Sequence, residues 1–349
     1  MRKIKRLFQY GILILILAGC QENIFGEEEK IENNRRCSLQ SVREIDVLAP
    51  FDRPKAEFSG LAWYGDWLVF LPQYPGQYAE RGSDGSLFYL ERDEIIAYLA
   101  NGDSHPLIPK IIALDADNLF SRFVGYEGFE AIVFLDEKVF LTIESKQKTG
   151  MMGYVVVGEI NDGNDPVITL DLDHAVEIPP QANLSNMTDE ALLIFDDHLY
   201  TFYEANGQSV NENPVSHTFS LLLEPFDAVD LVNIPFRLTD VTRADEDGKF
   251  WAMNYFYPGD RKLEGDFGHD LFSNLPTDEQ VPNIVERIIS LKFDSGGSIG
   301  AGKDEPICLE LREDGEARNW EGIVILDGFG FLMVTDQYPE TIVGFVEYP

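Results

Sequence analysis

At five points along the chain a short motif begins an apolar stretch, and a second apolar stretch follows it. A polar residue ends each second stretch, fourteen or fifteen residues after the second position of the motif. The opening motifs are 58–62, 129–133, 189–193, 238–242 and 320–324. The closing residues are Gln73, Glu144, Glu204, Asn254 and Asp336. An antiparallel hairpin returns to its own start, so each closing residue should lie beside its motif. Five copies predict ten polar side chains around one axis.

Each repeat extends into short strands rich in Val, Ile, Leu, Phe and Tyr, separated by Gly, Asp, Asn and Pro clusters. The predicted strands are 60–64, 67–71, 86–90 and 110–114; 131–135, 139–143, 153–160 and 167–170; 191–195, 199–203, 218–223 and 229–234; 241–244, 250–253, 287–293 and 307–311; and 322–326, 331–335 and 341–347. A short helix is expected at 93–99. The fifth repeat lacks an outer strand, which residues 42–48 can supply.

This pattern predicts an all-β fold, a five-bladed β-propeller over residues 41–349 that an N-terminal outer strand closes. A six-bladed ring, with one degenerate repeat hidden in an insertion, is the structural alternative.

The N-terminus combines four basic residues with an apolar run and the sequence Leu-Ala-Gly-Cys, which is typical of a lipoprotein signal peptide at 1–19. Cys20 would carry lipid, and 20–40 would form an acidic tether. We therefore expect an exported protein, anchored by lipid to a bacterial membrane in the cell envelope. A signal peptide cut elsewhere is the alternative.

The surface charge excludes some partners. Without the four basic leader residues the chain has 27 − 4 = 23 basic and 61 acidic residues, a net charge of −38. Such a chain repels nucleic acid and anionic lipid, and it favours divalent cations. Solubility, or a salty habitat, explains the bulk of these charges equally well. We expect a monomer whose ligand is a small anionic molecule or a glycan.

Cysteine and histidine usage argues against a zinc site. Apart from Cys20, only Cys37 and Cys308 occur, and the five histidines are scattered. An exported location permits a disulfide between these two cysteines, which would fasten the ring closure; two free thiols are the alternative. The sequence contains no phosphate-binding loop and no nucleophile elbow.

The second positions of the opening motifs predict a ring at the channel mouth, made of Ser59, Glu130, Glu190, Thr239 and Glu321. Three converging carboxylates repel one another unless a cation binds, and a ligand set of oxygens alone indicates calcium. Alternatively, these glutamates accept backbone hydrogen bonds and hold the blades together. The closing residues Glu144, Glu204 and Asp336 are candidate catalytic groups; pairing with loop lysines or arginines is their alternative role.

The loops on the same face supply candidate substrate contacts. Basic residues at Arg81, Lys146, Lys148 and Arg261, with Lys262 and His269, would suit an anionic ligand, although exposed loop lysines are common. Tyr74, Tyr257 and Tyr338 each precede a proline and can stack on a sugar or base, or pack between blades. The segment 258–283 is a candidate lid, with disorder as the alternative.

The order Ser, Glu, Glu, Thr, Glu at the strand starts resembles the calcium-dependent apyrases, five-bladed propellers that hydrolyse nucleoside di- and triphosphates. The phrases at 58–61, 128–132 and 320–323 also resemble esterase-like phytase propellers. The resemblance implies a central calcium held by the ring. The chain departs from the apyrases at 73–76 and 205–209, where that family has charged groups for the phosphate.

These observations predict a metal-dependent hydrolase of a phosphate ester or anhydride, with loop cations opposing substrate charge. A non-catalytic propeller that binds a glycan or a protein is the alternative. A glycosidase is a third hypothesis, which the separation of two carboxyl groups would decide.

Overall fold

The computed structural model describes residues 37–349 except 53–55, 81, 103–104, 264–270 and 273–283. The chain separates into two units, 1–34 and 35–349, and every described residue belongs to the second. The predicted signal peptide, Cys20, Arg81 and His269 lie outside the described residues. In the part of the chain that is described, no helix has the length and apolar character needed to cross a bilayer.

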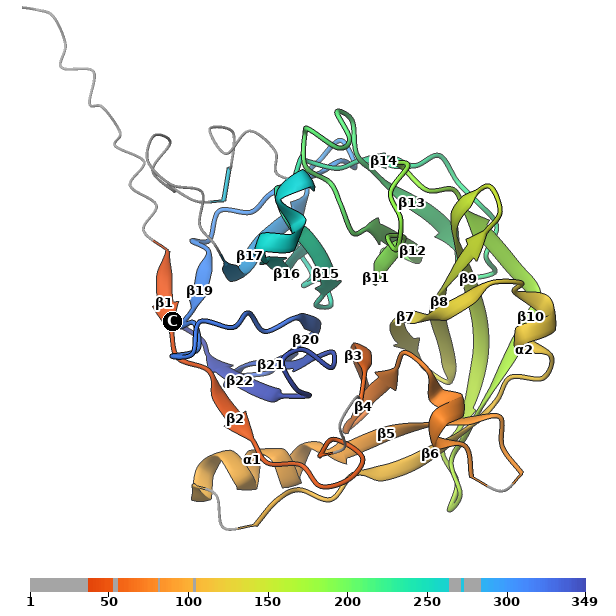
Figure 1. Ribbon diagram of the computed structural model, residues 1–349, viewed down its shortest axis with the longest axis vertical. Helices are drawn as coiled ribbons and strands as arrows, with labels where there is room; N and C mark the ends of the chain where they lie inside the picture. Colours follow the sequence, from red (N-terminus) through yellow and green to blue (C-terminus); the bar gives the residue numbers. More distant parts are fainter. Residues whose placement is uncertain (1–36, 53–55, 81, 103–104, 264–270, 273–283) are drawn as a thin grey trace, which may run out of the picture. The chain divides into compact units, whose positions relative to one another are not determined.

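The described residues form five antiparallel units of four strands each (Figure 1). The units are β3 (Phe58–Tyr64), β4 (Trp67–Pro72), β5 (Gly85–Glu91) and β6 (Lys110–Asp115); β7 (Tyr126–Leu135), β8 (Lys138–Gln147), β9 (Gly150–Asn161) and β10 (Val167–Ile178); β11 (Asp189–Phe195), β12 (His198–Tyr203), β13 (Val215–Ser220) and β14 (Val229–Asp230); β15 (Arg237–Val241), β16 (Lys249–Phe256), β17 (Val285–Phe293) and β19 (Ile307–Leu309); and β20 (Trp320–Leu326), β21 (Gly330–Thr335), β22 (Val343–Glu347) and β2 (Arg43–Ile45).

The innermost strands β3, β7, β11, β15 and β20 contact one another in succession, and β20 returns to contact β3. The sheets therefore stand around a common axis, and the fold is an all-β propeller, as predicted. No sixth unit occurs among the described residues.

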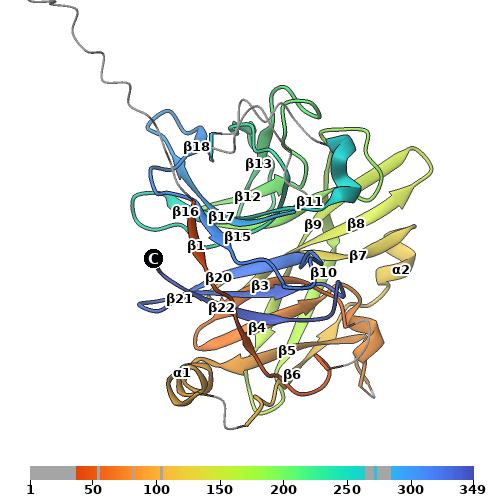
Figure 2. The same ribbon diagram turned by 60° about the vertical axis from the view of Figure 1, so that its left-hand side comes forward.

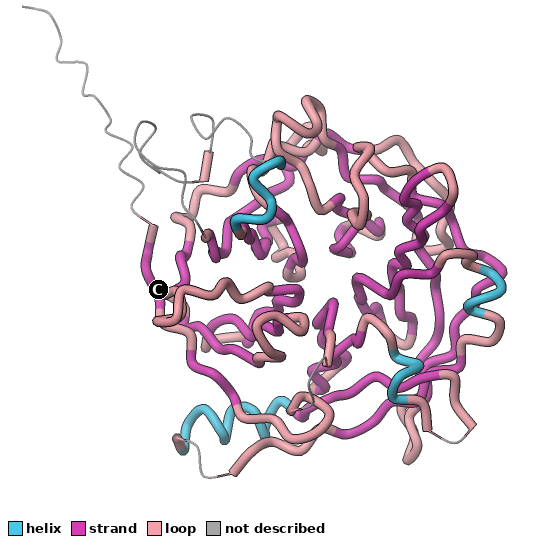
Figure 3. The backbone as a smooth tube through the Cα atoms, viewed as in Figure 1, coloured by secondary structure: helices cyan, strands magenta, loops and turns pink. Residues whose placement is uncertain are grey.

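The short helical segments lie in connections between strands (Figure 3). They are η1 (Pro75–Tyr78), α1 (Arg92–Asn101), α2 (Leu119–Arg122) and η2 (Pro258–Leu263). Only α1 was predicted. The parallel pairing of β6 with β10, which joins the first two units into one sheet, and the extra strand β18 (Ile299–Ala301) were also not predicted. The pairing of β6 with β10 joins segments that are distant in the chain, whereas β18 forms a local hairpin with β17.

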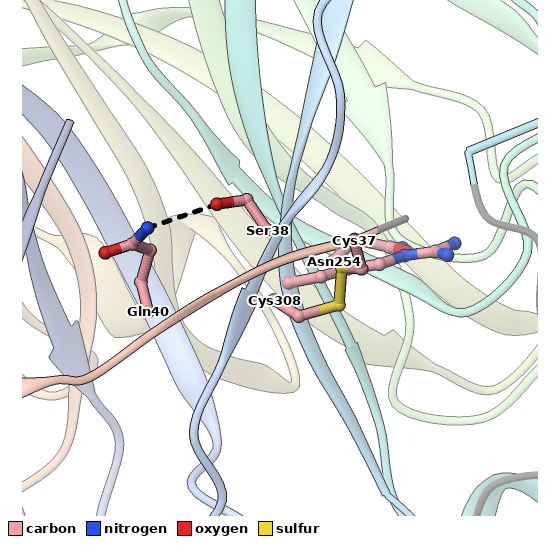
Figure 4. The surroundings of a disulfide bond; sticks show 6 residues. Cys37, Ser38, Gln40, Asn254 and Cys308 are labelled. Carbon is pink, nitrogen blue, oxygen red and sulfur yellow. Dashed lines mark hydrogen bonds between the residues drawn. A yellow bond between two sulfur atoms is a disulfide. The ribbon is translucent and has the colours of Figure 1, made fainter. Parts of the chain in front are cut away.

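The N-terminal strands close the ring. β2 pairs antiparallel with β22, the last strand of the chain, as predicted for residues 42–48. Just before it, β1 (Ser38–Gln40) pairs in parallel with β19, so the chain runs along the outer edges of two neighbouring units (Figure 2). Cys37 and Cys308 form a disulfide with Cα atoms 5.6 Å apart (Figure 4). Sheet pairing therefore starts at Ser38, within the stretch expected to be a tether.

Apolar faces of adjacent units pack against each other and form the core. Between the fifth and first units, for example, Phe58 and Phe70 pack with Leu332 and Val334, all fully buried. Each such side chain contributes about 1.5–3 kcal/mol on burial. This packing holds the innermost strands in place and so positions the residues at the channel mouth.

Candidate functional site

Every innermost strand has an irregular register at its opening motif. The irregularities fall between the pairs Phe58/Gly60, Phe129/Ile132, Asp189/Ala191, Leu238/Asp240 and Trp320/Gly322. One residue is skipped in four hairpins and two in the second, and each skipped stretch contains a residue of the predicted ring: Ser59, Glu130, Glu190, Thr239 or Glu321. A β-bulge leaves its extra residue outside the ladder and redirects the side chain. The five hairpins are thus equivalent at the position that the sequence analysis singled out.

The three ring glutamates are buried in one electrostatic neighbourhood. Burial raises the pKa of Glu130, Glu190 and Glu321 well above the usual range, and other carboxyl groups raise each pKa further. Glu190 is affected by both Glu130 and Glu321, although the three residues belong to different strands. One carboxyl oxygen of Glu321, Oε2, has no hydrogen-bond partner among the described residues.

Three closing residues contribute carboxyl groups to the same region. Burial raises the pKa of Glu144 to about 7 and that of Asp336 to about 6. Burial also raises the pKa of Glu204, whose carboxyl group lies close enough to that of Glu190 to share a hydrogen bond. The Arg237 guanidinium opposes the rise in pKa at all three of these carboxyls, and it contacts Glu204 directly.

The fourth closing residue was assigned one position too early. Asn254 pairs with Leu238, the first residue of its motif, whereas Glu144 pairs with Gly128, the residue that precedes its motif. Tyr255, opposite Arg237, is the equivalent position. The Asn254 side chain instead accepts a hydrogen bond from Arg287 at 2.7 Å, so it belongs to the interior of the sheet.

Arg237 is a central residue of the mouth that the sequence analysis missed. Its guanidinium donates to Glu204 and to both carboxyl oxygens of Asp260, with 2.9 Å between Nη2 and Oδ1. It also lies over the Tyr257 ring, 5.7 Å from the centroid. Arg237 directly precedes the fourth opening motif, and only the fold brings it to the carboxyls of other units.

Polar side chains at the mouth also connect neighbouring units. Gln73 Nε2 donates to Glu130 Oε1 at 3.2 Å, and Thr188 Oγ1 donates to Glu144 Oε2 at 3.2 Å. Thr239 Oγ1 donates to the carbonyl oxygen of Trp320 at 2.6 Å. These three bonds join neighbouring blades through side-chain donors, and none of them is a backbone N–H donating to a ring glutamate, which was the alternative role considered for the ring.

Asp240, which the sequence analysis did not single out, joins three innermost strands. It is buried and accepts the backbone N–H of Val241 on β15 and of Ile323 on β20, each at 2.8 Å. It also accepts a backbone hydrogen bond from Leu61 on β3. Burial raises its pKa well above the usual range, and these backbone bonds oppose that rise.

The candidate tyrosines have different positions. Tyr74 lies beside the mouth. Its burial and the nearby carboxyls of Glu57 and Glu130 raise its pKa to about 12. Tyr257 stacks on Tyr255 with ring centroids 5.9 Å apart. Tyr338 is 61% exposed, and its backbone N–H donates to Asp336 Oδ1.

The candidate basic residues contribute less to the described site. Lys146 and Lys148, at and just beyond the end of β8, are exposed. The backbone of Arg261 belongs to η2, and its side chain lies outside the described residues. Most of the candidate lid at 258–283 lies outside them too. Arg237 is therefore the basic side chain with described contacts to the carboxyls of the mouth.

Beyond the ring, the same strands line an apolar part of the channel. A cavity of about 270 Å³ contacts residues of all five innermost strands or their ends, including Leu61, Ile132, Leu193, Val241 and Val324. This apolar wall keeps water away from one side of the carboxyls, which accounts for the large contribution of burial to their pKa values.

The carboxyls suit a hard cation by chemistry but are not packed as direct ligands. Within the described ranges, no three His, Cys, Asp or Glu side chains are arranged to hold one ion. The donor set of the ring nevertheless consists of oxygens alone, and Glu321 has an unpartnered oxygen. The Thr239 hydroxyl donates its proton to Trp320, so its lone pairs remain available.

Comparisons with known proteins identify similar folds. No protein-family model and no curated protein sequence matches the chain. A glycosyl hydrolase from Bacteroides ovatus is 10% identical, with 84% of this chain and 85% of that chain covered and a TM-score of 0.47. The GH43 endo-arabinanase from Bacillus licheniformis is 9% identical, with 87% and 96% covered and a TM-score of 0.43.

An α-L-arabinofuranosidase from Clostridium thermocellum is 15% identical, with 82% and 83% of the two chains covered and a TM-score of 0.43. Likenesses this weak carry no inference about the activity of this chain. The resemblance to apyrases and phytases finds no support in a matching structure, beyond the propeller fold that it implied.

Proposed function

We propose that the protein is a calcium-binding propeller hydrolase that cleaves a neutral, hydroxyl-rich substrate of the glycan class at the mouth of its channel. One observation carries the proposal: six acidic side chains from three hairpins lie at the channel mouth, and the single described arginine there, Arg237, opposes the raised pKa of four of them. The six are Glu130, Glu144, Glu190, Glu204, Glu321 and Asp336. Such a site is costly in a folded protein unless protons or a cation neutralise it.

Calcium would be held by Ser59, Glu130, Glu190, Thr239 and Glu321, directly or through water. The raised pKa values mean that these glutamates favour the protonated form without a cation. Calcium binding would therefore release protons, and its affinity would rise with pH. When bound, calcium would offset the carboxylate charge and polarise a substrate oxygen.

Two closing residues have pKa values suited to acid–base catalysis. With a pKa of about 7, Glu144 is partly protonated at neutral pH and can donate a proton to a leaving oxygen. With a pKa of about 6, Asp336 is mostly ionised and can accept a proton from water. Arg237 holds Glu204, which adjoins the Glu190 carboxyl and positions it.

Charge selects the substrate class. A phosphate ester carries negative charge into a mouth that already contains six acidic groups, whereas a neutral glycan does not. Hydrolysis of a phosphate ester or anhydride is the second candidate function. The exposed Lys146 and Lys148 at the end of β8 favour it, because they can attract an anion once calcium is bound. The chain would act in the cell envelope, attached through Cys20.

Calcium titration of the mature protein tests the first half of the proposal. Isothermal titration is done at pH 6 and pH 8, in two buffers of different ionisation enthalpy. Calcium should bind more tightly at pH 8, and the difference between the two buffers should show that binding releases protons. Glu130→Gln and Glu321→Gln should each weaken calcium binding at least tenfold. Glu159→Gln, which alters an exposed carboxylate on β9, is the matched control and should change it less than twofold. Equal behaviour of the three variants would contradict the calcium site.

A substrate panel tests the second half. Neutral nitrophenyl glycosides and oligosaccharides should be hydrolysed in calcium and not in EDTA, with kcat reduced at least a hundredfold in Glu144→Gln or Asp336→Asn. Phosphate release from nitrophenyl phosphate or ATP would favour the second candidate. Calcium and glycan binding without turnover of any substrate would instead identify a non-catalytic binding module.

A further inference from the structure

A separate cavity lies beside the channel mouth, between the loop that follows β4 and the loop that follows β6. Its volume is about 440 Å³, which is within the range of small-molecule sites. Residues of η1 and α2 form its two sides, and Phe129 at the start of the second opening motif lies at its inner end. No residue of the predicted calcium ring lines it.

Aromatic rings dominate the wall of this cavity. Tyr126 stands edge to face with Phe120 and with Tyr74, at centroid separations of 5.4 Å and 6.3 Å and interplanar angles of 85° and 76°. Phe120 is 71% exposed, which is unusual for a side chain of this size. An exposed aromatic ring at the rim of a cavity indicates a surface that gains from covering.

The rim is held rigidly. Arg122, two residues after Phe120, donates to the carbonyl oxygens of Leu172 and Asp173, both at 3.1 Å, and fixes α2 to the second unit. On the other side, Gly85 lets Pro75 of η1 approach closely, because a Cβ at this position would lie 2.8 Å from Pro75. The aromatic groups are therefore presented in place before a ligand arrives, which lowers the entropic cost of binding.

The remaining lining residues indicate the chemistry of the ligand. Uncharged polar groups of Gln77, Asn118 and Ser121, and the carboxylate of Asp84, lie around the aromatic wall. None of the described residues that line the cavity is lysine or arginine, so a phosphate or carboxylate finds no counter-charge there. A sugar ring fits both features, since its C–H faces stack on aromatics and its hydroxyls pair with amide, hydroxyl and carboxylate oxygens.

The cavity is connected to the channel mouth by hydrogen bonds. The Tyr126 hydroxyl donates to the carbonyl oxygen of Gln73 at 3.1 Å, and the side chain of Gln73 donates to Glu130 at 3.2 Å. Tyr74 is in the cavity wall and also under the influence of the Glu130 carboxyl. An extended ligand can thus occupy the cavity and the mouth together.

We propose that this cavity is a saccharide subsite, which binds one sugar ring of a neutral oligosaccharide whose next residues lie at the carboxylate mouth. Binding of a sugar ring in the cavity is inferred from the cavity itself, whereas the placement of the next sugar residues at the mouth rests on the proposed function. Phe120 is its main stacking surface, and Tyr74 is the residue shared by the subsite and the mouth.

Binding of neutral disaccharides to the mature protein in EDTA tests the subsite without turnover. Titration and saturation-transfer NMR with xylobiose, cellobiose, maltose and arabinobiose should detect binding of at least one sugar. Phe120→Ala should weaken it about tenfold, and Phe120→Trp should restore it. Val124→Ala is the matched control: Val124 is 77% exposed near α2 but does not line the cavity, and the change should be less than twofold.

Three results would overturn the subsite: no sugar binds, Phe120→Ala behaves like Val124→Ala, or adenosine binds with the same Phe120 dependence while the sugars do not. The outcomes separate the two proposals. Phe120-dependent sugar binding by a protein that hydrolyses no glycoside supports the subsite and refutes the hydrolase. Glycoside hydrolysis whose KM is unchanged in Phe120→Ala supports the hydrolase and refutes the subsite.

Discussion

The two ends of the channel are made by the same five innermost strands, yet their chemistry is opposite. At the mouth, the bulged positions carry Glu130, Glu190 and Glu321, whose pKa values are raised well above the usual range. Two to five residues further along those strands, the channel is lined by apolar side chains such as Ile132 and Val324. Regular alternation would not concentrate carboxyls at one level; the bulge at each opening motif does so.

This difference shows that the apolar end of the channel affects the pKa values of the carboxyls at the charged end. Carboxyls that faced water on both sides would keep ordinary pKa values, whereas these are covered on one side by the apolar wall. An ion pair between an arginine and a carboxylate at each end shows the same difference in burial. Arg237 at the mouth is largely buried with Glu204, while Arg243 at the other end pairs with Asp327 and its side chain is 60% exposed.

The largest effect of a single substitution on stability is expected at Arg237, with Arg243 as the exposed counterpart. Arg237→Gln leaves two buried carboxylates without their partner and should lower the free energy of unfolding by about 3–5 kcal/mol. Arg243→Gln removes an exposed pair and should lower it by about 0–1 kcal/mol. Urea denaturation of both variants at pH 7 measures the contrast. Equal losses would show that the two ends do not differ in burial as described.

Shortening an apolar side chain separates stability from binding. Ile132 lines the apolar part of the channel and is nearly fully buried, so Ile132→Ala should cost about 2–4 kcal/mol by leaving a cavity. Calcium affinity, measured by titration of the folded variant, should stay within about twofold because no ring oxygen is changed. A large loss of calcium affinity would mean that the two ends act as one site.

The pH dependence follows from the raised pKa values. Glu144 changes from 4.5 to about 7 and Asp336 from 3.8 to about 6, so the folded protein binds more protons than the unfolded chain. Their contribution to stability is therefore fully present below about pH 4 and is lost as the pH rises through 6 to 7. Without calcium, denaturation curves should show a loss of about 5 kcal/mol between pH 4.5 and pH 7.5 attributable to these groups.

Saturating calcium should reduce this pH-dependent loss, because the cation replaces the protons at the mouth. Glu144→Gln should remove part of it, since glutamine has no charge to lose. A calcium-free protein whose stability is constant over this range, or rises with pH, would contradict the burial of these carboxyls.

The smallest expected effect is a gain in stability, in the variant Glu190→Gln. At pH 8 in EDTA, Glu190→Gln replaces a buried acid with a neutral group of the same size and should raise stability by about 1 kcal/mol. Glu159→Gln, on the outer part of its sheet unit, should change it by less than about 0.5 kcal/mol. In calcium the Glu190 variant should become the less stable of the two, because it has lost a ligand. Thermal melts in both conditions measure this change of sign.

The repeats could be read from the sequence because their signal is local. Alternating apolar residues and turn residues predicted most strand positions in the five units, and the N-terminal outer strand as well. The predicted strand at 241–244 was wrong, because the innermost strand of the fourth unit is β15, Arg237–Val241. The equivalence of the hairpins predicted which residues share the mouth. It failed at Asn254, because the connection between β15 and β16 is longer than in the other hairpins and places the equivalent position one residue later, at Tyr255.

Several parts of the site had no sequence signal. Arg237 and Asp240 belong to the fourth unit but contact carboxyls and backbone groups of its neighbours. The aromatic cavity combines residues from η1 and α2, neither of which was predicted. Their partners are distant in the chain, and a periodic pattern says nothing about such pairs.

By itself, the sequence determined the repeat, the strands and the identity of the residues at the bulged positions, since backbone conformation and apolar alternation act over a few residues. Only the tertiary structure decided how deeply the three glutamates are buried, that Arg237 lies among their neighbours, and that an aromatic cavity adjoins them. The physical reason is burial: the packing of whole sheets against one another sets how much water reaches a carboxyl group, and with it the charge that the site carries.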